Sequence, residues 1–230
     1  MLDKFKELLL KNIDPIVDNI AVTMQEMVIA DSLFYTRTGD EKGNIVYVPN
    51  SINIRTFTLL TESIEGLITK NEMQTLVNLC VYGPTNGNVI EIGSYKGRSA
   101  IFLAKGCEVR NEGIVYAIDP LISNNEEIIE NIKEYKDRIK FIRKYSYEAL
   151  ASVPNNNIRL LFIDGDHEYE GVKKDIELYS PLLNKDGIIA LHDFSLSGSG
   201  VVTAVMELIV GSQLYDNFVL SDSLFMARKK

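Results

Sequence analysis

The sequence of 230 residues has only two cysteines, Cys80 and Cys107, and no CxxC pair. So few cysteines argue against a disulfide scaffold and against a metal site built from thiolates. We therefore expect a protein of a reducing compartment, the cytoplasm, in which both cysteines are small buried apolar side chains.

The sequence also lacks a basic region and a long apolar run. Its formal net charge is −8, and its basic cluster Arg228-Lys229-Lys230 is too short for a nucleic-acid-binding surface. No segment approaches the roughly 18 consecutive apolar residues of a membrane span. The charges scattered through the opening MLDKFKELLLKNIDP are unlike a signal peptide. We expect neither a nucleic acid nor a membrane as partner.

Residues 1–67 lack the alternation of strand and helix patterns that marks the rest of the chain. Apolar residues at three- and four-residue steps around Pro15 predict one or two amphipathic helices, and a Gly-rich turn then precedes a short strand, Ile45–Val48. Two roles fit this N-terminal helical extension. It could pack or self-associate, which would make the protein a homo-oligomer, or it could form a lid over a substrate.

Residues 68–230 alternate apolar runs with helical segments, after a capping box, Thr69-Lys70-Asn71-Glu72, that opens the first helix. This alternation predicts an α/β fold with a doubly wound, mostly parallel sheet covered by helices on both faces. The last two runs are close enough to form a hairpin, so we expect one antiparallel edge strand. The expected strands are 88–92, 113–119, 139–142, 158–164, 187–192, 217–220 and 223–228. The expected helices between them are 98–105, 125–135, 147–152, 169–183 and 200–210.

Ligands of such sheets bind at the carboxyl ends of the strands, where this sequence places its glycines. The first strand ends in EIGSYKGRSA, in which Gly93 and Gly97 flank a loop that opens a helix. A dinucleotide fingerprint G-x-G-x-x-G would need glycine where Tyr95 and Arg98 stand. The loop, with Glu91 before it, suits a ligand that carries a carboxylate and an amine, although a purely structural glycine turn is also possible.

The second strand ends in Asp119, twenty-two residues after Gly97. An acid at this position accepts hydrogen bonds from ribose hydroxyls, and the alternative is an ordinary Asp-Pro turn. Together with the glycine loop, Asp119 indicates a nucleoside-containing cofactor.

The two histidines of the chain, His167 and His192, both follow strand ends, close to Asp164 and Asp193. The strands before them are neighbours in a doubly wound sheet, so we expect these side chains to converge. Asp164, His192 and Asp193 offer oxygen and nitrogen ligands for one divalent cation. His167 would then be available to take a proton near neutral pH.

These residues resemble the class I S-adenosylmethionine-dependent methyltransferases, over about Asn71 to Arg228. The loop is similar to the E-x-G-x-Y-x-G-x-S-A loop of catechol-type O-methyltransferases. The resemblance implies a seven-stranded Rossmann-like methyltransferase fold. It also implies that Tyr95 and Ser99 line the methionine end of the cofactor, that Asp119 binds the ribose and that Ser146 lies near the adenine. The cofactor-binding residues expected from the loop and strand ends are Glu91, Gly93, Ser94, Tyr95, Gly97, Ser99, Asp119, Ser146 and Asp164.

The stretch IDGDHEYEGVKKDIELYSPLLNKDGIIALHDF resembles the metal-dependent family that includes macrolide-sugar and aminocoumarin methyltransferases. In that family the first acid and the residues 28 and 29 positions further on hold magnesium, which here implies Asp164, His192 and Asp193. The residue three past the first acid is the base in several members, here His167. Members usually carry Asp or Glu at the position of His192, so the alternatives are a site for a softer metal and a site without metal.

The sequence thus predicts an O-methyltransferase with an S-adenosylmethionine-binding domain at 68–230. It would use S-adenosylmethionine, release S-adenosylhomocysteine and act on a hydroxyl of a small molecule, with Mg²⁺ and with His167 and Asp164 as catalytic residues. Two other classes stay open: a nicotinamide-dependent oxidoreductase on a similar sheet, and a non-catalytic binding protein that retains the cofactor fold.

Overall fold

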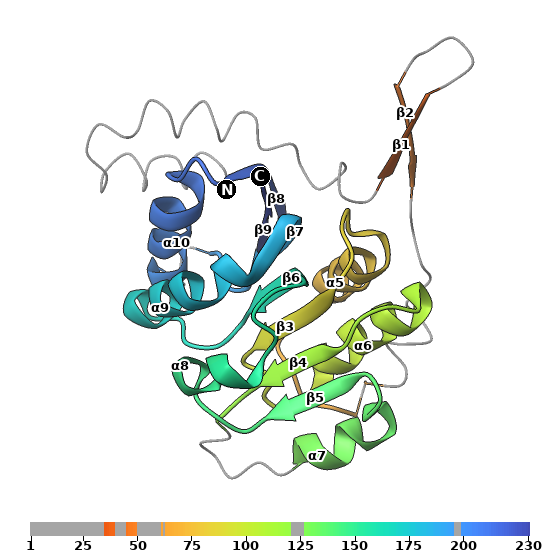
Figure 1. The fold of residues 1–230 in the computed structure, drawn as a ribbon, viewed down its shortest axis with the longest axis vertical. Coiled ribbons are helices and arrows are strands. Elements are labelled where there is room, and N and C mark those ends of the chain that lie inside the picture. The colour runs from red at the N-terminus through yellow and green to blue at the C-terminus, as the bar shows by residue number, and fades with distance from the viewer. Residues whose placement is uncertain (1–34, 40–44, 50–60, 62, 121–126, 196–198) are drawn as a thin grey trace.

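A seven-stranded sheet forms the centre of the molecule (Figure 1). The computed structural model describes residues 35–39, 45–49, 61, 63–120, 127–195 and 199–230. The strands of this sheet are β3 (Asn88–Ile92), β4 (Val115–Ile118), β5 (Ile139–Ile142), β6 (Ile158–Ile163), β7 (Leu183–Leu191), β8 (Tyr215–Ser221) and β9 (Leu224–Lys229). Their order is β5-β4-β3-β6-β7-β9-β8. Each expected strand is present, and its ends differ from the expected ones by at most four residues.

The five strands β3 to β7 run parallel, and β9 pairs antiparallel with both β7 and β8. The expected C-terminal hairpin is therefore confirmed, and the edge strand is paired antiparallel with its neighbour, as expected. The edge strand is β8, and β9 lies between it and β7. The helical crossover after β7 delivers β8 parallel to β7, and a tight turn at Asp222, which has a φ of 52°, folds β9 back into the gap.

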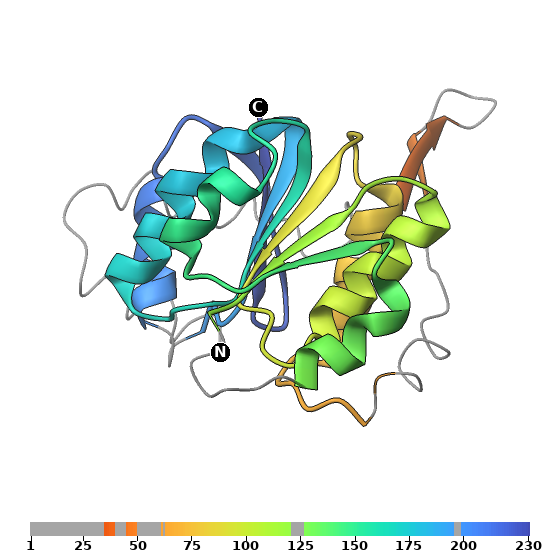
Figure 2. The ribbon, with the colours of Figure 1, turned by 60° about the horizontal axis from the view of Figure 1, so that its bottom comes forward.

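Helices cover both faces of the sheet, as Figure 2 shows. The helices on one face are α5 (Lys70–Tyr82), α6 (Arg98–Arg110) and α7 (Glu127–Ile132). Those on the other face are α8 (Ser146–Ala149), α9 (Tyr169–Tyr179) and α10 (Ser199–Val205). Short 3₁₀ turns extend α7, α8 and α9 over 133–135, 150–152 and 180–182, and a π-helical turn extends α10 over 206–210. Each helix layer buries its own apolar cluster against the sheet.

The central strand β6 shows why continuous apolar runs predicted this sheet. All six of its residues are buried, because helices cover both of its faces. Its one charged residue, Arg159, is buried at the amino end of the strands. The guanidinium there donates to the carbonyls of Cys80, Gly87 and Glu112 and to the sulfur of Cys107. Both cysteines are buried and form no disulfide, as expected.

Strand β7 begins four residues earlier than expected, at Leu183. The sequence Asn184-Lys185-Asp186-Gly187 is typical of a turn, and Asp186 does adopt a positive φ of 62°. The structure accommodates these residues as an irregularity in the pairing of β6 with β7, so the strand continues through them.

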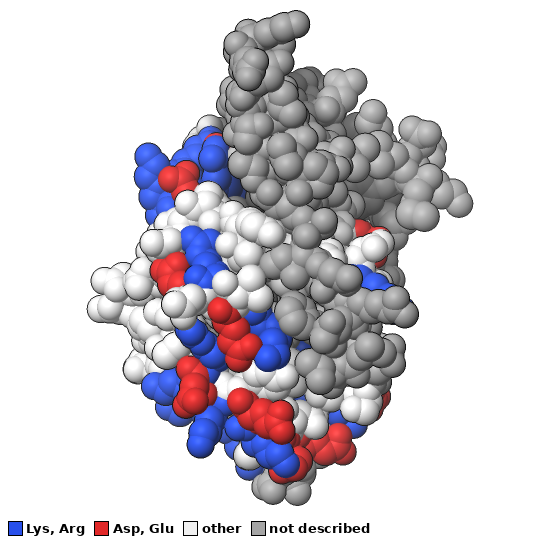
Figure 3. Space-filling view, turned by 90° about the vertical axis from the view of Figure 1, so that its right-hand side faces the viewer, with Lys and Arg blue, Asp and Glu red and all other residues white. Residues whose placement is uncertain are grey.

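Of the N-terminal extension, residues 1–67, the structure describes residues 61 and 63–67 and two strands, β1 (Tyr35–Gly39) and β2 (Ile45–Pro49), which form an antiparallel pair. The expected strand at Ile45–Val48 is confirmed as β2. The expected N-terminal helices lie outside the described residues, and the boundary at residue 67 stays a prediction. Among the described residues, none of the helices is long and apolar enough to cross a membrane. Figure 3 shows positive and negative side chains intermixed on the described part of one face.

Candidate active site

The carboxyl ends of β3, β4, β6 and β7 surround a cavity of about 900 Å³. It lies at the point where the strand order reverses, between β3 and β6, which is where α/β sheets bind ligands. Most of the expected site residues line this cavity: Gly93, Ser94, Tyr95, Ser99, Asp119, Ser146, Asp164, His167, His192 and Asp193. Glu91 and Gly97 do not; they lie behind its wall.

The glycine loop after β3 brings the ends of three strands together. Gly93 has a φ of 87°, and a Cβ at this position would lie 2.0 Å from the carbonyl oxygen of Asp164 after β6. Only glycine permits this close approach of the two strand ends. Tyr95 also has a positive φ, 44°, and its N–H donates to Asp119 Oδ2 at 2.8 Å after β4. The loop is therefore held in place from both neighbouring strands.

Glu91 supports this loop from inside the protein. It is fully buried, and Ser94 Oγ donates to its Oε2 at 2.7 Å. Burial raises the pKa of Glu91; hydrogen bonds with Ser99 and Ser94 lower it, nearby Asp164 and Asp119 raise it, and the result is a pKa of about 7. The carboxyl group thus changes its charge near neutral pH.

The opposite wall of the cavity is aromatic around Ser146, at the start of α8. Tyr145 and Tyr147 are both partly exposed and stack with ring centroids 5.3 Å apart. Asp175 of α9 is buried behind Ser146, and burial raises its pKa to about 6 against the lowering effect of a hydrogen bond with Ser146. Neither these tyrosines nor Asp175 were among the site residues expected from the sequence. The signal that could have found the tyrosines is their position directly after a strand end.

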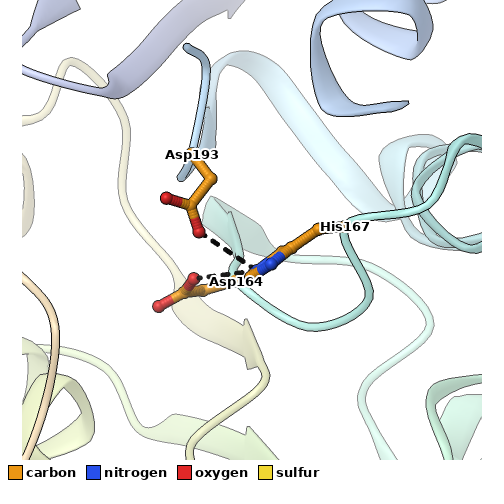
Figure 4. Close-up of side chains that lie close together, drawn as sticks. All are labelled: Asp164, His167 and Asp193. Atoms are coloured by element: carbon orange, nitrogen blue, oxygen red, sulfur yellow. Dashed lines mark ion pairs between the residues drawn. The ribbon is translucent and has the colours of Figure 1, made fainter. Parts of the chain in front are cut away.

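Three polar side chains converge at the ends of β6 and β7 (Figure 4). His167 Nε2 lies 3.2 Å from Asp193 Oδ2 and 3.8 Å from Asp164 Oδ1. The imidazole of His167 is half exposed, so a ligand in the cavity can reach it. Asp164 and then Asp193 raise the pKa of His167, and burial opposes them. Asp193 has a φ of 57°, an uncommon conformation for a residue other than glycine.

His192 lies deeper, with only 5% of its side chain exposed. Its Nδ1 is 3.2 Å from Asp164 Oδ1 and 3.3 Å from Asp193 Oδ2, but neither oxygen is placed for a hydrogen bond with it. Burial lowers the pKa of His192, and contacts with Asp164 and Glu72 outweigh burial and raise the pKa to about 11. Either a proton on Nδ1 or a cation among these three atoms would balance the two carboxylates.

The other ring nitrogen of His192 contacts a residue that the sequence analysis treated only as a helix cap. His192 Nε2 is 3.2 Å from Glu72 Oε2 in α5. Burial raises the pKa of Glu72, but hydrogen bonds from His192, Thr69 and Ser223 outweigh burial and lower the pKa to about 2. The capping box forms as expected, and nothing in its local pattern indicates the contact with a histidine 120 residues away.

The structure brings together one candidate metal-ligand group among the residues it describes. Ligand atoms of Asp164, His167 and Asp193 all lie within 4.8 Å of one another. The expected set contained His192 in place of His167. Both histidines direct a nitrogen at the same two carboxylates, so the structure adds His167 as a candidate third ligand.

Residues 90–194, which include all these strand ends, match a family model described as a methyltransferase domain. Over these residues the chain is similar to methyltransferase domains. The antiparallel β9 inserted between β7 and β8 belongs to the same sheet as the matched segment. The segment similar to methyltransferase domains therefore places its glycine loop, Asp119 and the Asp–His cluster around one cavity.

The chain is also similar to the uncharacterized protein R132 of Acanthamoeba polyphaga mimivirus, to which it is 32% identical over 162 residues. That match covers 64% of this chain, and the chain spans 65% of the length of the relative.

Two solved structures share the fold. An O-methyltransferase from Bacillus cereus, in complex with S-adenosylhomocysteine, has a TM-score of 0.60 at 18% identity, covering 76% of this chain and 88% of its own. The TDP-rhamnose 3'-O-methyltransferase CalS11 of calicheamicin biosynthesis has a TM-score of 0.55 at 19% identity, covering 76% and 91%.

Proposed function

We propose that the protein transfers the methyl group of S-adenosylmethionine to a hydroxyl of a small molecule and releases S-adenosylhomocysteine. The observation that carries this proposal is the single cavity that holds both the glycine loop and the Asp–His cluster, inside a segment that matches a methyltransferase domain. A cofactor on the loop and an acceptor near the cluster would lie side by side in one enclosure.

The loop side of the cavity would bind the cofactor. Backbone at Gly93, with the side chains of Ser94, Tyr95 and Ser99, would contact the methionine end. Asp119 would accept from the ribose, and Ser146, between the stacked tyrosines, would lie near the adenine. Glu91 and Gly97 would act from behind the wall, by shaping the loop that the cofactor touches.

The cluster side would bind the acceptor and remove its proton. The imidazole of His167 would take the proton as the acceptor oxygen forms its bond to the methyl carbon and the carbon–sulfur bond breaks. Asp164 and Asp193 would orient the imidazole, since both carboxylates lie within 4 Å of Nε2. Holding the acceptor in line with the methyl carbon is the main contribution that the cavity can make to the rate.

The residues of the cluster fit a divalent cation such as Mg²⁺. His192 Nδ1 is a buried nitrogen without a hydrogen-bond partner in the described chain, and it faces oxygens of two carboxylates. We propose that Asp164, His192 and Asp193 would hold the ion, which when bound would lower the pKa of an acceptor hydroxyl. In the metal-free alternative, His167 alone would deprotonate the acceptor. Activity that a chelator leaves unchanged would favour that alternative.

The acceptor and the role of residues 1–67 belong to the same proposal. CalS11 is described as acting on a nucleotide sugar, and a hydroxylated sugar or phenol would suit the polar cluster of this cavity. We propose that residues 1–67 contribute to acceptor choice or to a homo-oligomer contact, next to the cofactor-binding domain at 68–230, and that the protein acts in the cytoplasm.

Calorimetric titration of the protein with S-adenosylhomocysteine, NAD and NADP tests the cofactor. Binding of S-adenosylhomocysteine alone is the expected result. Binding of a nicotinamide nucleotide in its place would support the oxidoreductase and overturn our proposal.

Replacing the candidate base, in His167→Ala, separates an enzyme from a binding protein. With an acceptor found by screening hydroxylated metabolites against labelled cofactor, methyl transfer should fall about 10²-fold or more, while affinity for S-adenosylhomocysteine stays close to wild type. A variant that transfers methyl groups at the wild-type rate would remove His167 from the mechanism.

A further inference from the structure

The carboxylate of Glu72 is held by four donors from three parts of the chain. Its Oε2 accepts from Thr69 N at 2.8 Å, and its Oε1 accepts from Ser223 N at 2.9 Å and Ser223 Oγ at 2.7 Å. The fourth contact is His192 Nε2, at 3.2 Å from Oε2. Glu72 is fully buried and its position is set by the start of α5 and by the turn between β8 and β9.

This arrangement decides which nitrogen of His192 carries a hydrogen. An ionised carboxylate only accepts hydrogen bonds, so Nε2 must donate to Glu72. In a neutral imidazole the other nitrogen, Nδ1, then presents its lone pair. Nδ1 faces Asp164 Oδ1 and Asp193 Oδ2 at 3.2 and 3.3 Å without a hydrogen bond to either. A nitrogen with a free lone pair beside two carboxylate oxygens provides ligand atoms that suit a divalent cation.

We propose that Glu72 is a positioning residue, which orients His192 and fixes its Nε2–H tautomer so that Nδ1 is presented to a divalent cation beside Asp164 and Asp193. The proposal rests on the proposed function, since it assigns a cation to the same site. A carboxylate on the second nitrogen of a metal-binding histidine is a general device that fixes the ring and raises its basicity as a ligand.

A purely structural role for Glu72 is the competing explanation, and the chain offers variants that separate the two. Ser223→Ala and Thr69→Ala weaken the attachment of Glu72 to its surroundings and leave its contact with His192. Glu72→Gln replaces one carboxylate oxygen by an amide group that can donate to Nε2. A structural role predicts that all three variants behave alike, whereas the positioning role singles out Glu72→Gln.

The presence of only two histidines makes the tautomer directly measurable. Long-range ¹H–¹⁵N spectra of ¹⁵N-histidine-labelled protein, loaded with S-adenosylhomocysteine and Mg²⁺, contain two ring systems, and His167→Ala assigns them. We expect a protonated Nε2 and an unprotonated Nδ1 for His192 in wild type and Ser223→Ala, and loss of this pattern in Glu72→Gln. A protonated Nδ1 in loaded wild-type protein would overturn the proposal.

Manganese binding, followed by electron paramagnetic resonance without any acceptor, gives an independent measure. Glu72→Gln should weaken Mn²⁺ binding at least about tenfold, and Ser223→Ala should leave the affinity within about twofold of wild type. Equal Mn²⁺ affinities in wild type, Glu72→Gln and Ser223→Ala would refute a positioning role for Glu72. Binding of S-adenosylhomocysteine is measured in the same samples: if wild type does not bind it, the proposed function fails, whatever the Mn²⁺ result.

Discussion

The buried carboxyl group of Glu91 should make the stability of the protein depend on pH. Its pKa is about 7 in the folded protein, against 4.5 for an ordinary glutamate, chiefly because the carboxyl is buried. Between these two values the unfolded chain releases its proton while the folded protein keeps it. The unfolded state therefore gains relative stability as the pH rises from about 4.5 to about 7, and the folded protein carries a constant penalty above that.

At about 1.4 kcal/mol per pKa unit, the full penalty is about 3 kcal/mol. Glu91→Gln keeps an oxygen that can accept from Ser94 but carries no charge at any pH. The free energy of unfolding of the variant, relative to wild type, should therefore rise by about 2 to 3 kcal/mol between about pH 5 and about pH 8.5. Taking the difference between two pH values cancels any constant cost of the substitution.

Urea unfolding followed by circular dichroism at both pH values measures this difference. Glu148→Gln is the matched control, because Glu148 is exposed on α8, and its effect should not depend on pH. If Glu91→Gln also shows no dependence on pH, the carboxyl of Glu91 is not held protonated near neutral pH, and the physical reasoning about its burial is wrong.

Two further predictions concern the ligand set and the buried arginine. His192→Asn should weaken Mn²⁺ binding at least about tenfold while His167→Ala has little effect; the reverse order would make His167 the ligand and leave no base. Arg159→Met removes the donor to two buried carbonyls and one partly buried carbonyl and should cost about 3 kcal/mol in urea unfolding. The exposed Lys136→Met is its control, and a cost below about 1 kcal/mol would show that those carbonyls do not depend on Arg159.

The sheet was predictable because its strands are buried on both faces. Runs such as Ile158–Ile163 are apolar except for Arg159, and helical segments separate them. The start of β7 was not predictable, because Asp186-Gly187 is typical of a turn and only pairing with β6 extends the strand through it. The position of β9 was not predictable either, since a hairpin pattern does not show which of its strands joins the sheet.

Some features of the candidate site were likewise predictable from the sequence, and others were not. The sequence alone determined that Asp119, Asp164, His167, His192 and Asp193 follow strand ends, and parallel strands must bring those ends to one edge of the sheet. Of the expected cofactor residues, it could not separate those that line the cavity from Glu91 and Gly97, which lie behind the wall. Which residues face the cavity depends on the direction of each side chain, and the irregular backbone of a loop does not allow that direction to be predicted from the sequence.

The contact of Glu72 with His192 arises only from the packing of the folded chain. Its capping box with Thr69 already explains the residue locally, so no pattern in the sequence calls for another partner. Packing of α5 against the sheet brings its carboxylate to His192 and to the turn at Ser223. A buried polar group needs a hydrogen-bond partner, and that partner can come from any part of the chain that the fold brings near. The sequence therefore determined which side chains stand at the strand ends, and the packing of a distant helix decided which way His192 faces.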